Sequence, residues 1–300
     1  MNKSLIILIV VFVLIIVILS STNNNIETFE NKRPKQKIVI PSNDDIYDRF
    51  YSGIYDGLFG DKAKVLFEVN QITKNALKKW KGPKNSIRIL DAGCGTGWHT
   101  KLLSKNYDII GLDRSPYMLK EANKINNKDV LKLGNIKDTN LFSRNSFTHI
   151  LCLYYTIYYI KNLNQMFKNF YKWLVPGGVI VIHVVDRENF DPLLNASSPF
   201  PLFSLQRYSK KRLTESKVHF NNFIYKGKFH LDKSNDRATF QEIFTYKKKP
   251  KVRKQTHTLY MPDINFIVEK AKGNGFTLIH KIGLIPVSFE YHYLYIFRKM

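Results

Sequence analysis

Cysteine is scarce in this chain of 300 residues, which contains only Cys94 and Cys152. Because the two lie far apart in apolar or glycine-rich segments, the sequence offers neither a disulfide framework nor the cysteine cluster of a structural zinc site. We therefore expect a reducing compartment and no metal. The chain also lacks an internal repeat and the Gly-Lys-Ser/Thr of a Walker loop, which excludes that class of nucleotide site.

Acidic residues are also few: 24 Asp and Glu stand against 47 Lys and Arg, a formal net charge of +23. The excess is uneven, since residues 207–254 hold 15 basic and 4 acidic side chains, a net +11. Such a stripe attracts phosphates, which predicts an anionic partner, either RNA or lipid headgroups. A solvated basic face without a partner is the alternative.

Residues 5–19 form an uninterrupted apolar run and predict a transmembrane helix over residues 1–21. The alternative is a cleaved signal peptide, but the run ends in "SSTNNN" without an Ala-x-Ala-like site. Residues 22–42, rich in Asn, Lys and Pro, are typical of a polar linker. Because several positive residues follow the run and only Lys3 precedes it, we expect a single-pass membrane protein whose catalytic domain is cytosolic.

From residue 87 onward, short β-branched runs alternate with helical stretches, as in a parallel sheet with crossover helices. The expected strands lie at 87–91, 107–112, 129–133, 147–153 and 178–185, and the expected helices at 98–105, 116–126 and 161–173. Residues 186–260 are basic and aromatic and predict an antiparallel β insert, followed by a helix at 262–272 and two strands. We therefore assign residues 43–300 to one α/β domain that contains this insert.

The stretch "ILDAGCGTGWH", residues 89–99, places a turn with three glycines directly after the first expected strand. Glycines let the backbone turn tightly and approach a ligand closely, at the sheet edge where open α/β folds bind their ligands. A dinucleotide site would have a small residue where this chain has Trp98. The turn is therefore not the usual site for a pyrophosphate.

Two carboxylates accompany this turn. Asp91 closes the first strand, and Asp113 closes the second strand 22 residues later. A carboxylate at the end of the second strand can accept hydrogen bonds from both hydroxyls of a ribose. A carboxylate beside a turn without phosphate donors suits an ammonium group, so the pair predicts a nucleoside that carries positive charge.

At these residues the sequence resembles the class I S-adenosylmethionine-dependent methyltransferases, in particular the group called methyltransferase type 11 or 25. The resemblance covers about residues 45–185, and residues 255–298 more loosely. It implies a Rossmann-like, mostly parallel sheet in the order 3-2-1-4-5-7-6, with the last strand antiparallel. It also implies S-adenosylmethionine as the cofactor, held by the residues that match the family's binding segments: Asp91, Gly93, Cys94, Gly95, Gly97, Asp113, Asn135 and Ile136.

Two of these family positions depart from the usual pattern. An acid commonly stands where this chain has Asn135, although the amide oxygen of Asn135 can also accept a hydrogen bond. His149 replaces a frequent Asp on the fourth strand, where a structural histidine is the simplest interpretation.

Tyrosines are the candidates for the substrate pocket. Tyr47 and Tyr51 lie one helical turn apart in a segment that often covers the cofactor in the resembling family. Tyr154 and Tyr155 follow the fourth strand, where their ring faces can stabilise the cation of a methyl donor. Core packing is the alternative role for all four.

Methyl transfer is an in-line displacement that depends mainly on positioning, so a catalytic base is needed only when the acceptor must lose a proton. His183 and Asp186, at the end of the fifth strand, are the candidate catalytic residues for that step. A structural role is the alternative for each.

The sequence thus predicts a membrane-tethered methyltransferase that acts on a small-molecule, lipid or protein acceptor, with the insert at 186–260 recognising the substrate. An RNA methyltransferase that uses the basic insert is one alternative, although the fourth strand reads "LCLYY" and lacks the Asn/Asp-Pro-Pro-Tyr/Phe common among methylators of base amino groups. A catalytically inactive, membrane-bound interaction module of the same fold is the other. The intact glycine turn and its two carboxylates argue against that module.

Overall fold

A mixed sheet of seven strands, in the order β4-β3-β2-β5-β6-β12-β11, forms the base of the site in the computed structural model, which describes residues 36–41, 43–193 and 212–300. The strands are β2 (Arg88–Ala92), β3 (Asp108–Asp113), β4 (Leu131–Leu133), β5 (Phe147–Cys152), β6 (Leu174–Val185), β11 (Phe276–Leu284) and β12 (Phe289–Lys299). Neighbouring strands from β4 to β6 pair in parallel, whereas β12 is antiparallel to both β6 and β11. Numbered along the chain, the order is 3-2-1-4-5-7-6 with an antiparallel last strand, so the predicted topology is confirmed.

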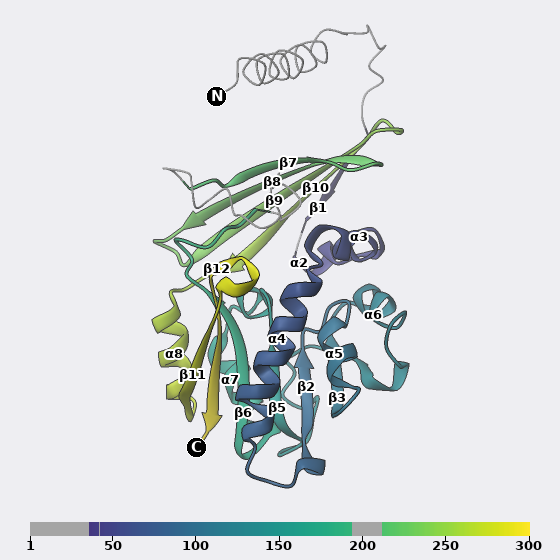
Figure 1. The fold of residues 1–300 in the computed structure, drawn as a ribbon. Coiled ribbons are helices and arrows are strands. Elements are labelled where there is room, and N and C mark those ends of the chain that lie inside the picture. Colours follow the sequence, from purple (N-terminus) through teal and green to yellow (C-terminus); the bar gives the residue numbers. More distant parts are fainter. Residues whose placement is uncertain (1–35, 42, 194–211) are drawn as a thin grey trace, which may run out of the picture. The chain divides into compact units, whose positions relative to one another are not determined.

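The sheet is buried on both faces, as crossover connections require. Ile89 and Leu90 of the central strand β2 point to opposite faces, and neither has any exposed surface. Ile89 packs in a cluster with residues of α4 (Lys62–Asn75) and α5 (Trp98–Leu103). Leu90 packs in a cluster with residues of α7 (Leu163–Trp173) and α8 (Ile264–Gly273), which lie on the other side of the sheet (Figure 1).

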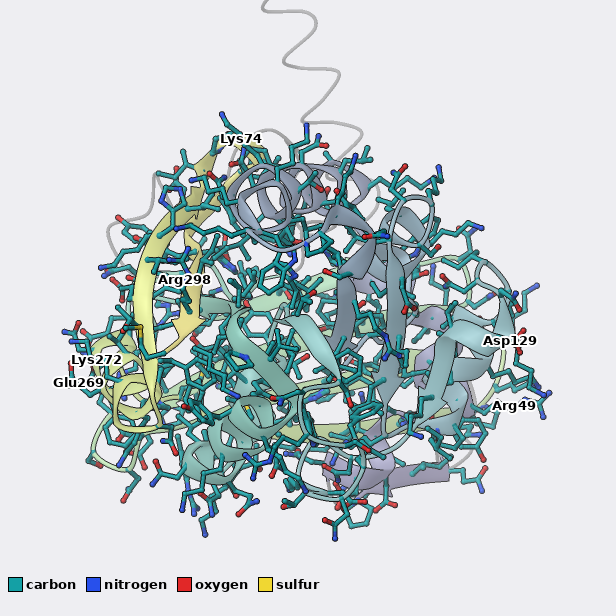
Figure 2. The ribbon with its side chains drawn as sticks, turned by 90° about the horizontal axis from the view of Figure 1, so that it is seen from below. Arg49, Lys74, Asp129, Glu269, Lys272 and Arg298 are labelled. Carbon is teal, nitrogen blue, oxygen red and sulfur yellow. The ribbon has the colours of Figure 1, made fainter. Side chains whose placement is uncertain are left out.

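The helices begin where the sequence supplies capping side chains. Asp61 accepts the backbone N–H of Lys64 at the start of α4, and Asp263 does the same for Phe266 in α8. Other helices include α2 (Asn43–Ile46), α3 (Arg49–Phe59), α6 (Pro116–Ala122) and the short 3-10 helix η4 (Thr156–Tyr159). Charged residues such as Lys74, Asp129 and the Glu269–Lys272 ion pair lie at the periphery (Figure 2).

A second, five-stranded sheet has the order β1-β10-β9-β8-β7 and contains the predicted insert (Figure 1). Its strands are β1 (Gln36–Ile40), β7 (Glu215–His219), β8 (Phe223–Asp232), β9 (Arg237–Tyr246) and β10 (Lys251–Tyr260). The pairs from β7 to β10 are antiparallel, as expected. On β8, buried Tyr225 and Phe229 alternate with exposed Lys226 and Lys228, so part of the basic charge faces away from the core.

Two local predictions differ from the structure near the amino-terminal side of this domain. Residues 36–40, which were expected to belong to a polar linker, form strand β1 because "QKIVI" supplies β-branched residues that pair with β10. The expected continuous helix around Tyr47 and Tyr51 is broken at Tyr47. Asp48 accepts the N–H of Tyr51 and thereby caps the start of α3.

The predicted membrane localisation is contradicted. Across residues 36–41, 43–193 and 212–300, no helix is both long and apolar enough to cross a membrane. The transmembrane helix predicted over residues 1–21 lies outside the described residues.

Candidate active site

The glycine turn connects β2 to α5 at the carboxyl edge of the seven-stranded sheet, as predicted. Gly93 has φ +83°, and its N–H donates to the carbonyl of Leu112 at 2.7 Å. A Cβ on Gly93 would lie 2.5 Å from Cγ2 of Thr156, so only glycine allows the loop after β5 to approach this closely. The bare turn therefore brings the ends of β2 and β5 together around one space.

The two carboxylates at the strand ends are both held by the turn region. Asp91 is 2% exposed and accepts the Thr100 hydroxyl at 2.8 Å. Asp113 accepts the N–H of Gly95 through Oδ2 and the N–H of Ser115 through Oδ1, each at 2.9 Å. Burial raises the pKa of Asp91 and of Asp113 above the usual range. A ligand that brings a positive charge or hydrogen-bond donors would therefore stabilise the charged form of each carboxylate.

A cavity of about 1060 Å³ opens at this edge. Residues from both sheets line it, because Phe229, Phe240 and His257 of the insert face the strand ends of the seven-stranded sheet. Most of the residues predicted to hold the cofactor or substrate lie in its lining: Asp91, Gly93, Cys94, Gly95, Asp113, Asn135, Ile136, Tyr47, Tyr51, Tyr154 and Tyr155. The amide oxygen of Asn135 also accepts the N–H of Lys137 at 3.0 Å, so one of its lone pairs is in use.

Three predicted site residues do not line the cavity. Gly97 lies under α6, where a Cβ would be 2.9 Å from Ala122, and therefore has a packing role. His183 has no exposed surface, and Asp186 lies beyond the end of β6. The structure therefore places neither of the two predicted catalytic residues in the lining of the cavity.

His183 instead holds a cavity-lining tyrosine in place. Its Nδ1 donates to the carbonyl of Tyr154 at 2.6 Å, and its Nε2 lies 3.1 Å from Nδ1 of His292. Tyr154 has φ +52°, a left-handed conformation that is unusual for a bulky residue and needs such support. Burial, reinforced by the Lys64 ammonium, lowers the pKa of His183 to about 4, so this histidine is neutral near pH 7.

A buried ionic cluster beside the cavity was not predicted from the sequence. Lys64 and Glu68, one turn apart on α4, form an ion pair at 2.7 Å, and His99 lies 2.9 Å from the other oxygen of Glu68. Burial opposes ionisation of Glu68, but Lys64 and His99 outweigh it and lower the pKa of Glu68 well below its usual range. The i, i+4 spacing of Lys64 and Glu68 was a local signal for this pair.

The amino-terminal helix α3 is tied directly to the glycine turn. Asp56 accepts the Thr96 hydroxyl at 2.7 Å and the indole N–H of Trp98 at 2.9 Å. Trp98 lines the cavity and, through this hydrogen bond, ties α3 to the glycine turn. This contact fixes the tyrosine-bearing segment against the edge of the sheet.

Comparison with known proteins agrees with this geometry. Residues 90–182, from β2 to β6, match the family model described as methyltransferase domain. This part of the chain is a methyltransferase domain. The predicted resemblance is thereby confirmed, and the match covers the glycine turn, Asp91 and Asp113.

Solved structures of methyltransferases share the fold across the described domain. The CcbJ methyltransferase from Streptomyces caelestis has a TM-score of 0.63 at 13% identity and covers 86% of this chain and 99% of its own. An S-adenosylmethionine-dependent methyltransferase from Clostridium acetobutylicum has a TM-score of 0.59 at 18% identity, over 83% of this chain and 98% of its own. The methyltransferase fold therefore includes the insert as well as the seven-stranded sheet.

Similarity to curated proteins is more local. The chain is 31% identical over 39% of its length to 47% of dTDP-3-amino-3,6-dideoxy-alpha-D-glucopyranose N,N-dimethyltransferase from Streptomyces fradiae. It is 32% identical over 33% of its length to 20% of phosphoethanolamine N-methyltransferase from Triticum aestivum. A glycine/sarcosine N-methyltransferase from Parasynechococcus marenigrum is 27% identical over 37% of this chain and 41% of that protein. The chain thus spans less than half the length of each of these relatives.

Proposed function

We propose that this methyltransferase domain transfers the methyl group of S-adenosylmethionine to an amine on a small molecule bound in the cavity. The observation that carries the proposal is the placement of Asp91 and Asp113 on one cavity wall with the side-chain-free turn at Gly93 between them. A carboxylate pair and a bare backbone fit the ammonium, ribose and close packing of that cofactor. When bound, it supplies an electrophilic methyl group on a sulfonium.

Each residue would contact a different part of the cofactor. Asp91 would face the ammonium of the methionine part, while Asp113 would accept the ribose hydroxyls with the lone pairs that Gly95 and Ser115 leave free. Gly93 and Cys94 would border the methionine part, and Asn135 with Ile136 would border the adenine. These assignments follow from the family match together with the shared cavity.

Room for a second molecule supports an acceptor of small size. Small-molecule pockets usually measure roughly 300 to 1000 Å³, and this cavity is about 1060 Å³. Aromatic side chains from the amino-terminal segment and from the segment after β5 wall it: Tyr47, Tyr51, Tyr55, Tyr154, Tyr155 and Tyr159. Ring faces favour cations, and exclusion of water favours in-line displacement between two molecules held together.

Amines are the acceptor class we favour because the three curated relatives described above are N-methyltransferases by name. The test uses the full chain, methyl-labelled S-adenosylmethionine and a panel of glycine, sarcosine and phosphoethanolamine, with glycolate as the hydroxyl counterpart of glycine. We expect label in an amine and none in glycolate, with transfer reduced in Asp91→Ala and Asp113→Ala. Cofactor binding without transfer to any of the amines would reject the acceptor class, and no cofactor binding would reject the function.

A further inference from the structure

A chain of buried and partly buried hydrogen bonds runs from the inner face of the five-stranded sheet to the cavity wall. It joins side chains of β9 and β10 to the tyrosines beside α3 and on η4. Its members, from the far end to the cavity, are Asp48, Arg253, Gln255, Glu242, His257, Tyr159 and Tyr47. The guanidinium of Arg253 and the carboxylate of Glu242 together determine the direction of these bonds.

Arg253 fixes the far end of the chain. It is 4% exposed, and it donates to Asp48 at 2.6 Å and to Oε1 of Gln255 at 2.7 Å. Because a guanidinium has donors only, the Gln255 oxygen must face Arg253 and its amide N–H₂ must face Glu242, which lies at 2.7 Å. Glu242 therefore accepts from Gln255.

Glu242 has no exposed surface, and three donors surround its carboxylate. Gln255 and His257 contact Oε2, each at 2.7 Å, and the Tyr225 hydroxyl donates to Oε1 at 3.0 Å. A carboxylate that only accepts requires a proton on Nε2 of His257. Nδ1 of His257 is then the acceptor, and it lies 2.5 Å from the hydroxyl of Tyr159.

The last two members, Tyr159 and Tyr47, continue the same direction of hydrogen-bond donation as far as the cavity. Tyr159 donates to His257, so it accepts from the Tyr47 hydroxyl at 2.9 Å. Tyr47, Tyr159 and His257 all line the cavity. Once Tyr47 has donated to Tyr159, its oxygen still has lone pairs with which to accept a proton from a molecule in the cavity.

We propose that this chain is a proton relay that deprotonates the methyl acceptor, with Tyr47 as its contact to the substrate and His257 as its proton store. The role rests on the proposed function, because an amine must lose a proton to become a nucleophile. The N–H bond of the ammonium breaks, leaving the pair on nitrogen to attack the methyl group. The released proton goes to the hydroxyl oxygen of Tyr47. Tyr47 passes its own hydroxyl proton to Tyr159, and Tyr159 passes its own to Nδ1 of His257.

The imidazolium formed in this step would be stabilised where it forms. Glu242 faces it from β9 and Tyr159 from η4, while Arg253 lies on the same strand. The ring of Tyr47 and the hydroxyl of Tyr51, 3.4 Å from Nε2, face it from the segment around α3. Burial raises the pKa of Tyr47 and of Tyr159, so each hydroxyl keeps a proton at rest and passes one on only as it receives another. The proton returns to solvent after the product leaves.

The first test determines the direction of the hydrogen bonds in the chain, and it needs no methyl acceptor. In the full chain labelled with nitrogen-15 in its histidines, we expect the His257 imidazole to be the Nε2–H tautomer when neutral. A His257 that carries its proton on Nδ1 would overturn the relay.

The second test measures transfer to whichever amine of the panel accepts label. Tyr159→Phe breaks the chain and should lower kcat on the order of 10²-fold with little change in KM, and it should remove the acid limb of the pH profile of kcat. Tyr158→Phe is the matched control, since Tyr158 is buried in the same helix but its hydroxyl contacts only the backbone of Val185.

The outcomes separate the relay from the function on which it rests. Wild-type kcat and an unchanged pH profile in Tyr159→Phe would overturn the relay while leaving the methyltransferase intact. If the wild-type protein transferred no label to any amine, the proposed acceptor class would fail and the relay with it. A variant that has lost cofactor binding in calorimetry would be replaced by Tyr47→Phe, which breaks the same chain at its other hydroxyl.

Discussion

Replacing Asp113 by asparagine separates the support of the turn from the binding of the cofactor. In the structure one carboxylate oxygen accepts the N–H of Gly95 and the other accepts the N–H of Ser115. Asparagine has a single side-chain oxygen, so in Asp113→Asn one of these two backbone donors would face an amide donor. The same change also removes the charge that we expect to hold the ribose hydroxyls.

The two effects should differ in size. Losing one hydrogen bond and leaving its donor unpaired costs about 1 to 3 kcal/mol. However, burial already raises the pKa of Asp113, so removing the charge offsets part of that cost, and we expect the free energy of unfolding to fall by only about 1 kcal/mol. Hydrogen bonds to a charged group contribute about 1.5 to 3 kcal/mol, so S-adenosylmethionine should bind roughly 10- to 100-fold more weakly.

Isothermal titration calorimetry on the full chain gives the affinity, and urea unfolding gives the stability. Asp108→Asn is the matched control, because Asp108 lies at the opposite end of the same strand in an exposed ion pair with Arg88. That variant should bind the cofactor as the wild type does. Equal affinities for the wild type and Asp113→Asn would refute the role given to Asp113.

Three further predictions concern stability and the site. Burial lowers the pKa of His149 and of His183 to about 4, so the stability they contribute is complete above about pH 6.5 and is lost as the pH falls toward 4. At pH 5 each histidine should lower the free energy of unfolding by ~2 kcal/mol relative to pH 7.5. Urea unfolding at the two pH values should therefore show a decrease that is ~2 kcal/mol smaller in His149→Leu than in the wild type. Gly93→Ala should lower both stability and cofactor affinity more than Gly177→Ala, because both residues have positive φ but only at Gly93 would a methyl group lie 2.5 Å from a neighbouring side chain; equal losses in thermal unfolding would contradict this. Asp56→Asn should increase hydrogen exchange in the amino-terminal helix that its side chain ties to the glycine turn, and unchanged exchange would show that this tie is unimportant.

The topology could be predicted because its signals are local. Each strand of the parallel part is a short apolar run, and the glycine turn with Asp91 and Asp113 marks the carboxyl edge where a ligand binds. The order of the last two strands came from the resemblance and not from periodicity. The break before α3 also had a local cause, because Asp48 caps that helix. The spacing of the tyrosines instead suggested one continuous helix.

The burial of His183, one of the two candidate catalytic residues, follows from the packing of β12. His183 is near the end of β6, and β12 pairs alongside, as the predicted strand order implies, with Leu294 opposite His183. The His292 ring then stacks on the imidazole at 5.2 Å. No local pattern in residues 174–185 specifies that the side chain of His292 will cover His183.

The hydrogen-bonded chain from Arg253 to Tyr47 was beyond sequence reasoning for a similar reason. Tyr159 and His257 are 98 residues apart, and Asp48 and Arg253 are 205 apart. Each of these residues is ordinary in its own strand or helix. Only the packing of the insert against the amino-terminal segment brings them together.

The most direct test of the account is a crystal structure of the full chain with S-adenosylhomocysteine, the demethylated product of the cofactor. We predict that its ribose hydroxyls lie within hydrogen-bond distance of Asp113, its ammonium faces Asp91, and its sulfur points toward the side of the cavity that Tyr47 and Tyr159 line. A nucleoside bound outside this cavity, or crystals grown at saturating ligand in which the cavity holds none, would contradict the assignment of the site.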